Sequence, residues 1–136
     1  MIPSDAKAFE KHHYKFFSLD YAKTWEEAKS YCEDLGGHLA IIDSSEENDF
    51  LYRLMIAEGY SSAYLGITDC ENEGRWSWID DTIPVYTNWH SGEPNSQNMG
   101  EDYGMFYKKF TDGTWNDGDF GKGDNKGTAF ICEWDD

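Results

Sequence analysis

The chain has few cysteines, few cations and no long apolar run, and each shortage excludes a class of protein. Lys and Arg number 11 among 136 residues, against 27 Asp and Glu, so the formal net charge is −16. Phosphate binding needs clustered cations, so we expect no nucleic-acid partner and no anionic membrane surface. No apolar stretch approaches the ~20 residues of a membrane-spanning helix, so we also expect no membrane insertion.

The N-terminal residues, MIPSDAKAFEKHHYK, lack the apolar core of a signal peptide. We therefore expect a domain taken from a longer protein whose export is specified elsewhere. A length of 136 residues suits one domain with a buried core. We place this domain at residues 14–136, after an N-terminal lead-in at residues 1–13.

Three cysteines, Cys32, Cys70 and Cys132, cannot all pair within one chain. A bridge between Cys32 and Cys132 would close a loop of roughly 100 residues, which stabilises by several kcal/mol in the chain-entropy model. The alternative is three reduced thiols in a cytosolic protein, which composition by itself slightly favours. Cys70 is either a small residue at a strand end or an exposed thiol able to cross-link two chains.

Two helices are expected in the first half of the chain. Thr24 with Glu27, and Ser44 with Glu47, have the spacing of capping boxes at helix N-termini. Each start is followed by apolar residues at helical spacing and then by glycine: Trp25, Ala28 and Cys32 before Gly36-Gly37, and Phe50, Leu51, Leu54 and Met55 before Gly59.

Short strands are expected elsewhere. The segments AYLGI, RWSWI, DYGMFYKKF and TAFICEW are aromatic and β-branched and are separated by Gly, Asn and Asp, as in antiparallel strands. Asp112-Gly113 predicts a tight hairpin before Trp115. An early strand beginning at FFSLDY should pair with the last strand and bring the ends of the chain together. Helices followed by strands predict an α+β domain.

A long loop holds most of the candidate functional residues. About twenty residues between RWSWI and DYGMFY have little regular pattern, and a loop of that length in a compact domain is uncommon unless it is functional. It contains SGEPNSQNMGED, and TWND follows the hairpin. Solvated acidic turns are common, but these two segments offer five carboxylate or amide side chains, which suit Ca²⁺: Glu93, Asn95, Glu101, Asn116 and Asp117.

The order of these residues resembles the mannose-type, calcium-dependent branch of the C-type lectin-like domain family. EPN at 93–95, ED at 101–102 and WND at 115–117 carry the resemblance. Further similar segments extend from about Tyr14 to Trp134: TWEEAKSYCEDLGGHLAIIDSSEEN, YLGITD, GRWSWIDD, TNWHSGEPN and FICEW. The resemblance implies the C-type lectin-like fold, with two helices, short antiparallel sheets, a long calcium-binding loop region and neighbouring termini.

The resemblance implies a calcium-dependent carbohydrate-recognition domain. The five side chains named above would bind the primary Ca²⁺, and Asp117 would add its backbone carbonyl. Two vicinal sugar hydroxyls would complete the coordination and hydrogen-bond to the same side chains. The acid at 93 and the amide at 95 resemble the type that binds mannose, glucose, N-acetylglucosamine and fucose, whereas the galactose type has an amide first and an acid third. The resemblance also implies a cis peptide bond before Pro94.

Three further expectations follow from the resemblance. An accessory Ca²⁺ site would use Asp69, Glu73 and Asp102 with Glu101, although Ser96 stands where an acid or amide is usual. Cys32 and Cys132 would form a disulfide. Weak Ca²⁺ sites belong outside cells, so we expect an extracellular, secreted or cell-surface location with glycans as partners.

The sequence gives less support to other functions. A pair of glycosidase carboxylates needs one raised pKa, whereas exposed acids that share Ca²⁺ stay ionised, so we expect no enzyme. Trp76, Trp78, Trp89 and Trp115 are expected in the core rather than as sugar-stacking platforms. The histidines, His12, His13, His38 and His90, include no pair at helical metal-ligand spacing, which gives no support to a zinc site; His90 is a candidate glycan contact. The main alternative is a domain of the same fold that binds protein or another surface, with calcium only structural.

Overall fold

The computed structural model describes residues 2–72, 74–94, 103–118 and 127–135. Its elements are β1 (Lys7–Phe9), β2 (His12–Ser18), the 3₁₀ turn η1 (Leu19–Tyr21), α1 (Trp25–Asp34), β3 (His38–Leu39), α2 (Ser45–Ala57), β4 (Ser62–Thr68), β5 (Ser77–Trp78), β6 (Tyr103–Tyr107), β7 (Trp115–Gly118) and β8 (Thr128–Asp135). Among the described residues, no helix has the length and apolarity needed to cross a membrane.

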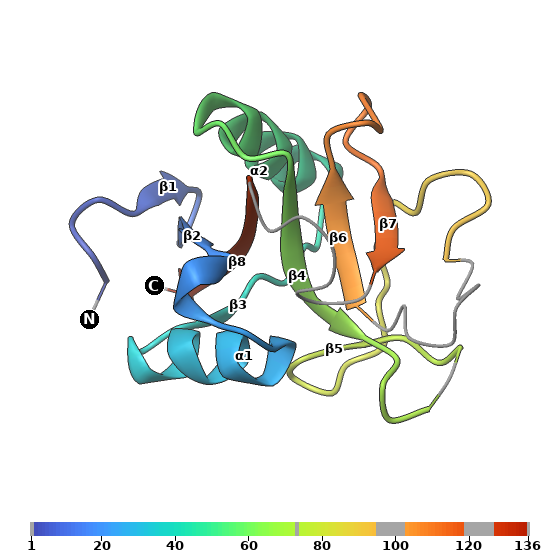
Figure 1. Ribbon diagram of the computed structural model, residues 1–136, viewed down its shortest axis with the longest axis horizontal. Helices are drawn as coiled ribbons and strands as arrows, with labels where there is room; N and C mark the ends of the chain where they lie inside the picture. Colours follow the sequence, from blue (N-terminus) through green and yellow to red (C-terminus); the bar gives the residue numbers. More distant parts are fainter. Residues whose placement is uncertain (1, 73, 95–102, 119–126, 136) are drawn as a thin grey trace.

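One mixed sheet forms the centre of the molecule (Figure 1). Its strands lie in the order β1-β2-β8-β4-β6-β7, with β3 paired to β8 and β5 paired to β4. All pairs are antiparallel except β4 with β8. The expected pairing of the early strand with the last strand is confirmed by β2 and β8. Strand β1 and the end of β8 lie on the side of the molecule opposite β7 (Figure 1).

Both helices begin where the capping residues predict. The Thr24 hydroxyl accepts a hydrogen bond from the Glu27 amide, and the Ser44 hydroxyl accepts one from the Glu47 amide. Each bond pairs a backbone N–H of the first helical turn that has no partner within the helix. Helix α1 ends before Gly36 and α2 before Gly59, and both glycines have φ of +86°. Glycine takes this conformation without steric cost.

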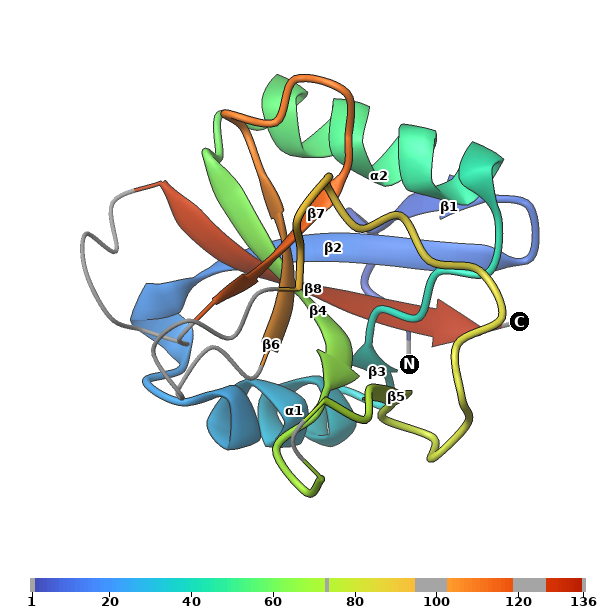
Figure 2. The ribbon, with the colours of Figure 1, turned by 90° about the vertical axis from the view of Figure 1, so that its right-hand side faces the viewer.

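The helices cover opposite faces of the sheet (Figure 2). Trp25, Ala28 and Cys32 of α1 pack with residues of β8 in one apolar cluster. Leu51 and Met55 of α2 pack in the other. Two of the residues predicted for the apolar stripe of α2, Phe50 and Leu54, are only half-buried and lie at the edge of this second cluster.

A disulfide joins Cys32 of α1 to Cys132 of β8, with the two Cα atoms 5.5 Å apart. The bridge ties α1 to the middle of the sheet across 100 residues of sequence. The predicted pairing is confirmed. Cys70, which follows β4, is a free and exposed thiol. Cys70 thus lies just beyond a strand end and is exposed, and its ability to cross-link two chains stays a prediction.

The N-terminal segment differs from the expectation of a lead-in. Residues 7–9 form β1, and His12 and His13 begin β2. His12 is opposite Asp135 and His13 is opposite Trp134 in the antiparallel pair with β8. His12 and His13 thus belong to the sheet, because β8 is long enough to pair with them. The proposed domain boundary at residue 14 falls inside β2.

Candidate functional site

Strand β7 carries two of the five predicted ligands. It pairs antiparallel with β6, so that Asn116 is opposite Met105 and Asp117 is opposite Gly104. Asn116 is half-buried and Asp117 is fully buried. The two side chains therefore come from a paired strand, and the sheet fixes the position of their backbone.

Strands β6 and β7 form a hairpin as predicted, but its connection spans residues 108–114 and is longer than the tight Asp112-Gly113 turn expected. Asp112 accepts hydrogen bonds from the backbone amide and hydroxyl of Thr114, at 3.2 and 2.6 Å. Gly113 has φ of +78°. Asn48 of α2 donates to the Gly113 carbonyl at 2.9 Å and accepts from the Trp115 indole at 2.7 Å. The start of β7 is thereby fixed to helix α2 through a buried amide.

The segment that leads to Glu93 lies beside β7. Trp115 donates its amide to the Asn88 carbonyl at 2.8 Å, and His90 donates its amide to the Trp115 carbonyl at 2.9 Å. A parallel bridge pairs Trp89 with Trp115. The chain then turns, and the Glu93 amide donates to the His90 carbonyl at 2.8 Å. The structure thus brings the backbone segment of Glu93 next to the strand of Asn116 and Asp117.

The peptide bond between Glu93 and Pro94 is cis, which confirms the expectation for Pro94. Glu93 itself is half-buried. The other two predicted ligands, Asn95 and Glu101, lie outside the described residues. In sequence, Glu101 comes two residues before Tyr103, which is opposite Gly118 in the pair of β6 with β7.

Of the predicted accessory ligands, only Asp69 lies within the described residues. It follows β4 and is 2% exposed. Its carboxylate accepts a hydrogen bond from the Gly74 amide at 2.7 Å, and its carbonyl accepts one from the Asn72 amide at 3.1 Å. Asp69 therefore fixes the backbone of Asn72 and Gly74 after β4. Glu73 and Asp102 lie outside the described part of the chain.

The comparison with known proteins agrees with this arrangement. A sequence model described as "Lectin C-type domain" matches residues 21–134. The chain belongs to the C-type lectin domain family.

Two relatives and one solved structure illustrate the similarity of this C-type lectin domain. It is 39% identical over 119 residues to the Perlucin-like protein of Mytilus galloprovincialis, covering 85% of this chain and 73% of that protein. It is 38% identical over 104 residues to the Hepatic lectin of Gallus gallus, covering 75% of this chain and 47% of that protein. The carbohydrate-recognition domain of the human scavenger receptor C-type lectin superposes with a TM-score of 0.82 at 32% identity, covering 100% of both chains. The family consists in general of non-enzymatic lectins.

The tryptophans of the lectin domain belong to its core. Trp78 and Trp115 are 3% and 0% exposed, which confirms the prediction for these two. Trp76 and Trp89 are half-buried and pack on the same cluster, with their ring centroids 4.7 Å apart. Trp115 lies edge-on to Trp89 at 5.5 Å. Trp89 thus packs against Trp115 of β7, in the segment that leads to Glu93.

His90 of the lectin domain is directed toward the hairpin. Its ring stacks on Phe110 at 3.8 Å with an interplanar angle of 9°. Its Nδ1 lies 2.7 Å from the Thr114 hydroxyl. These contacts orient the imidazole on the β6–β7 turn, where it helps to fix the start of β7.

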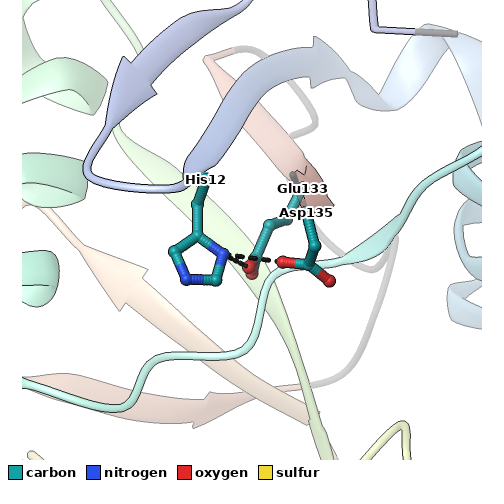
Figure 3. Close-up of side chains that lie close together, drawn as sticks. All are labelled: His12, Glu133 and Asp135. Atoms are coloured by element: carbon teal, nitrogen blue, oxygen red, sulfur yellow. Dashed lines mark hydrogen bonds and ion pairs between the residues drawn. The ribbon is translucent and has the colours of Figure 1, made fainter.

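Sequence reasoning missed a polar cluster between β2 and β8 of the lectin domain. His12, Glu133 and Asp135 bring three potential metal-ligand atoms within 4.8 Å of one another (Figure 3). The signal was the pair of acids two residues apart on the last strand, which places both on one face. The acids alone did not predict the cluster, because His12 was expected in a lead-in and not in a strand paired with β8.

The pKa values of the two acids in this cluster are shifted in opposite directions. Burial, with a hydrogen bond to Asp135, raises the pKa of Glu133 to about 10. Partial burial opposes ionisation of Asp135, but hydrogen bonds from Glu133, His38 and His12 bring its pKa down to about 2. Glu133 therefore keeps its proton at neutral pH while Asp135 is ionised.

Proposed function

We propose that this C-type lectin domain binds carbohydrate through Ca²⁺ and prefers sugars of the mannose type. The observation that carries the proposal is the segment ending at Glu93, which is hydrogen-bonded beside the strand that bears Asn116 and Asp117. Two segments about twenty residues apart in the sequence thereby present carboxylate and amide oxygens from neighbouring backbone positions.

The chemistry of the donor set fits calcium. Glu93, Asn116 and Asp117 offer hard oxygen donors, and neither sulfur nor imidazole is among them. Asn95 and Glu101 would add an amide and a third carboxylate, which gives a site of net charge −1 with a divalent cation. Bound Ca²⁺ would supply open coordination positions for two vicinal hydroxyls of a sugar. Ca²⁺ accepts six to eight oxygens in flexible geometry, so protein and sugar oxygens fit together on one ion.

The side chains would distinguish sugars by hydrogen-bond direction. A carboxylate only accepts, so Glu93 and Glu101 would accept hydrogen bonds from the sugar hydroxyls. The amides of Asn95 and Asn116 would donate to the hydroxyl lone pairs. The order of acid at 93 and amide at 95 favours the equatorial 3- and 4-hydroxyls of mannose, glucose and N-acetylglucosamine, and an equivalent pair in fucose.

A second Ca²⁺ would lie near the first and serve the loop rather than the sugar. Asp69 follows β4, and its buried carboxylate accepts a hydrogen bond from the Gly74 amide. Glu73, Glu101 and Asp102 would complete this accessory site. Its proposed role is structural, because none of these residues except Glu101 is assigned to the sugar.

We propose that the domain acts outside the cell as part of a secreted or cell-surface protein. The Cys32–Cys132 disulfide suits an oxidising compartment. Two hydroxyls and a few hydrogen bonds bury little area, so one domain would bind a monosaccharide weakly, and several copies would be needed for high avidity. We propose binding without catalysis, because carboxylates that share a bound Ca²⁺ stay ionised, whereas a general acid needs a raised pKa.

A glycan array, run with calcium and again with excess chelator, tests the proposal. We expect signal on mannose, glucose, N-acetylglucosamine or fucose ligands with calcium, and its loss with chelator. Chelator-resistant binding to a protein would instead support the alternative function, a protein- or surface-binding domain with only structural calcium. No glycan signal under either condition would also contradict the proposal.

The sugar preference has a separate test in the double variant Glu93→Gln with Asn95→Asp. The exchange reverses the order of acceptor and donor while keeping the total charge and the side-chain lengths. We expect the preference to turn from mannose toward galactose by about tenfold or more, because buried polar groups that face the wrong partner are costly. Inhibition of binding by free mannose and free galactose measures the ratio. An unchanged ratio would contradict the hydrogen-bond argument without contradicting calcium binding.

A further inference from the structure

Three strands bring two histidines and two acids to one face of the sheet. His12 of β2 is the Cα partner of Asp135, and Tyr14 of β2 is the partner of Glu133. His38 of β3 is the partner of Glu133 on the other side of β8. Residues opposite one another, or two apart along a strand, share a face of the sheet. The side chains therefore converge because of the register of β2, β8 and β3.

The contacts within the cluster are short. His12 Nδ1 lies 2.6 Å from Asp135 Oδ1 and 2.7 Å from Glu133 Oε2 (Figure 3). The side chain of Glu133 is 3% exposed, that of His12 33% and that of Asp135 52%. One imidazole nitrogen and two carboxyl oxygens thus surround a single point at the edge of the core, with solvent on one side.

His38 contacts the cluster from β3. Its Nδ1 lies 2.7 Å from the Leu39 carbonyl, which only accepts, so Nδ1 carries a hydrogen. Its Nε2 lies 2.8 Å from Asp135 Oδ2. His38 therefore contacts Asp135 Oδ2, while Asp135 Oδ1 is directed at His12.

We propose that His12 Nδ1, Glu133 Oε2 and Asp135 Oδ1 form a binding site for a divalent transition-metal ion, with Zn²⁺ as the expected occupant. The donor set decides the type of ion. An imidazole nitrogen with carboxylate oxygens suits zinc, whereas calcium takes oxygen ligands almost alone. Zinc takes ionised carboxylates, so its binding would release the proton of Glu133 to solvent. Water would hold the fourth position of the tetrahedron.

The geometry needs only a small adjustment. With metal–ligand bonds of 2.0–2.2 Å, neighbouring ligands of a tetrahedral zinc lie about 3.4 Å apart, so the 2.6 and 2.7 Å contacts would widen by about 0.7 Å. The ligands also have outer partners of the kind that zinc sites use. Glu133 Oε1 accepts from the Ile41 amide at 2.9 Å, and His38 holds the second oxygen of Asp135.

The site is independent of the proposed sugar site. Strands β8, β4 and β6 lie between β2 and β7 in the sheet. In Figure 1 the end of β8 and β7 lie on opposite sides of the molecule. A metal here would join the strand near the start of the chain to the strand near its end. Its expected effect is therefore on stability and not on sugar preference.

Zinc titration of the metal-stripped protein in excess calcium tests the inference. We expect one Zn²⁺ per chain, measured by calorimetry, and a rise in unfolding temperature of about 5–10 °C when free zinc is 100-fold above its dissociation constant. Co²⁺ in place of zinc should give the visible absorption of a tetrahedral site. Absence of binding up to about 100 μM zinc would overturn the inference.

Three variants locate the metal. His12→Gln and Asp135→Asn should each weaken zinc binding by at least about 100-fold, and His38→Gln, which acts through Asp135, by about 10–100-fold. His13→Gln is the matched control, because its side chain lies on the opposite face of β2 and its zinc affinity should stay within about twofold of the wild type. Equal zinc affinity in His12→Gln and the wild type would place the ion elsewhere and overturn the assignment. So would displacement of zinc by an equal concentration of calcium.

Discussion

Asp117→Asn is expected to weaken calcium binding by at least about 100-fold and to abolish sugar binding at millimolar calcium. The change keeps the shape of the side chain and removes one of three proposed carboxylates. Loss of an outer-shell partner already costs metal sites 10–100-fold, and a direct ligand should cost more. Calcium titration by calorimetry, with binding to immobilised mannose as the second readout, measures both effects.

Asp49→Asn is the matched control for this variant. Asp49 is exposed on α2, and its replacement by Asn removes the same charge. Calcium affinity and mannose binding should therefore both stay within about twofold of the wild type. Because Asp117 is fully buried, unfolding must also be measured without calcium. Wild-type calcium affinity in Asp117→Asn would contradict the assignment. An equal loss of stability with and without calcium would show that Asp117 serves the fold rather than the ion.

Replacing both bridged cysteines, as Cys32→Ala with Cys132→Ala, is expected to lower the free energy of unfolding by about 4–5 kcal/mol. The bridge closes a loop of 100 residues and so removes much of the freedom of the unfolded chain. Domains of this size are stable by only about 5–15 kcal/mol, so the variant should unfold at much lower denaturant concentration. Urea unfolding followed by tryptophan fluorescence measures the change.

Cys70→Ala is the control for the disulfide variant. Cys70 is exposed and unbridged, so its replacement should change the free energy of unfolding by no more than about 0.5 kcal/mol. A double variant within about 1 kcal/mol of the wild type would show that the bridge adds little to stability, against the chain-entropy account.

Local signals in the sequence gave most of the secondary structure. The capping pairs at Thr24 and Ser44 act within one turn of helix, and Asp112-Gly113 acts within one hairpin. Such signals involve only residues that are close in the sequence, so they can be recognised before the tertiary structure is known. The burial of Phe50 and Leu54 was less predictable, because the width of the buried face of α2 depends on how the helix rests on the sheet.

The N-terminal strands show where local reasoning failed. Lys7–Phe9 and His12-His13 have no strong strand pattern, and their strand conformation comes from pairing with each other and with β8. That pairing depends on how far the last strand extends, a long-range property. The contact of His12 with Asp135 across 123 positions of sequence therefore had no signature in the region of the histidines.

The sequence alone determined the family, the two helices, the disulfide partners and the types of oxygen donor at the proposed calcium site. The helices and the donor types follow from residue identity and short spacing, and the disulfide partners follow from the resemblance to the family. Only the tertiary structure decided which donors lie together: Glu93 beside the strand of Asn116 and Asp117, and His12 with Glu133 and Asp135. The reason is physical, since strand register sets which distant side chains share a face, and register is fixed by the packing of the whole sheet against both helices.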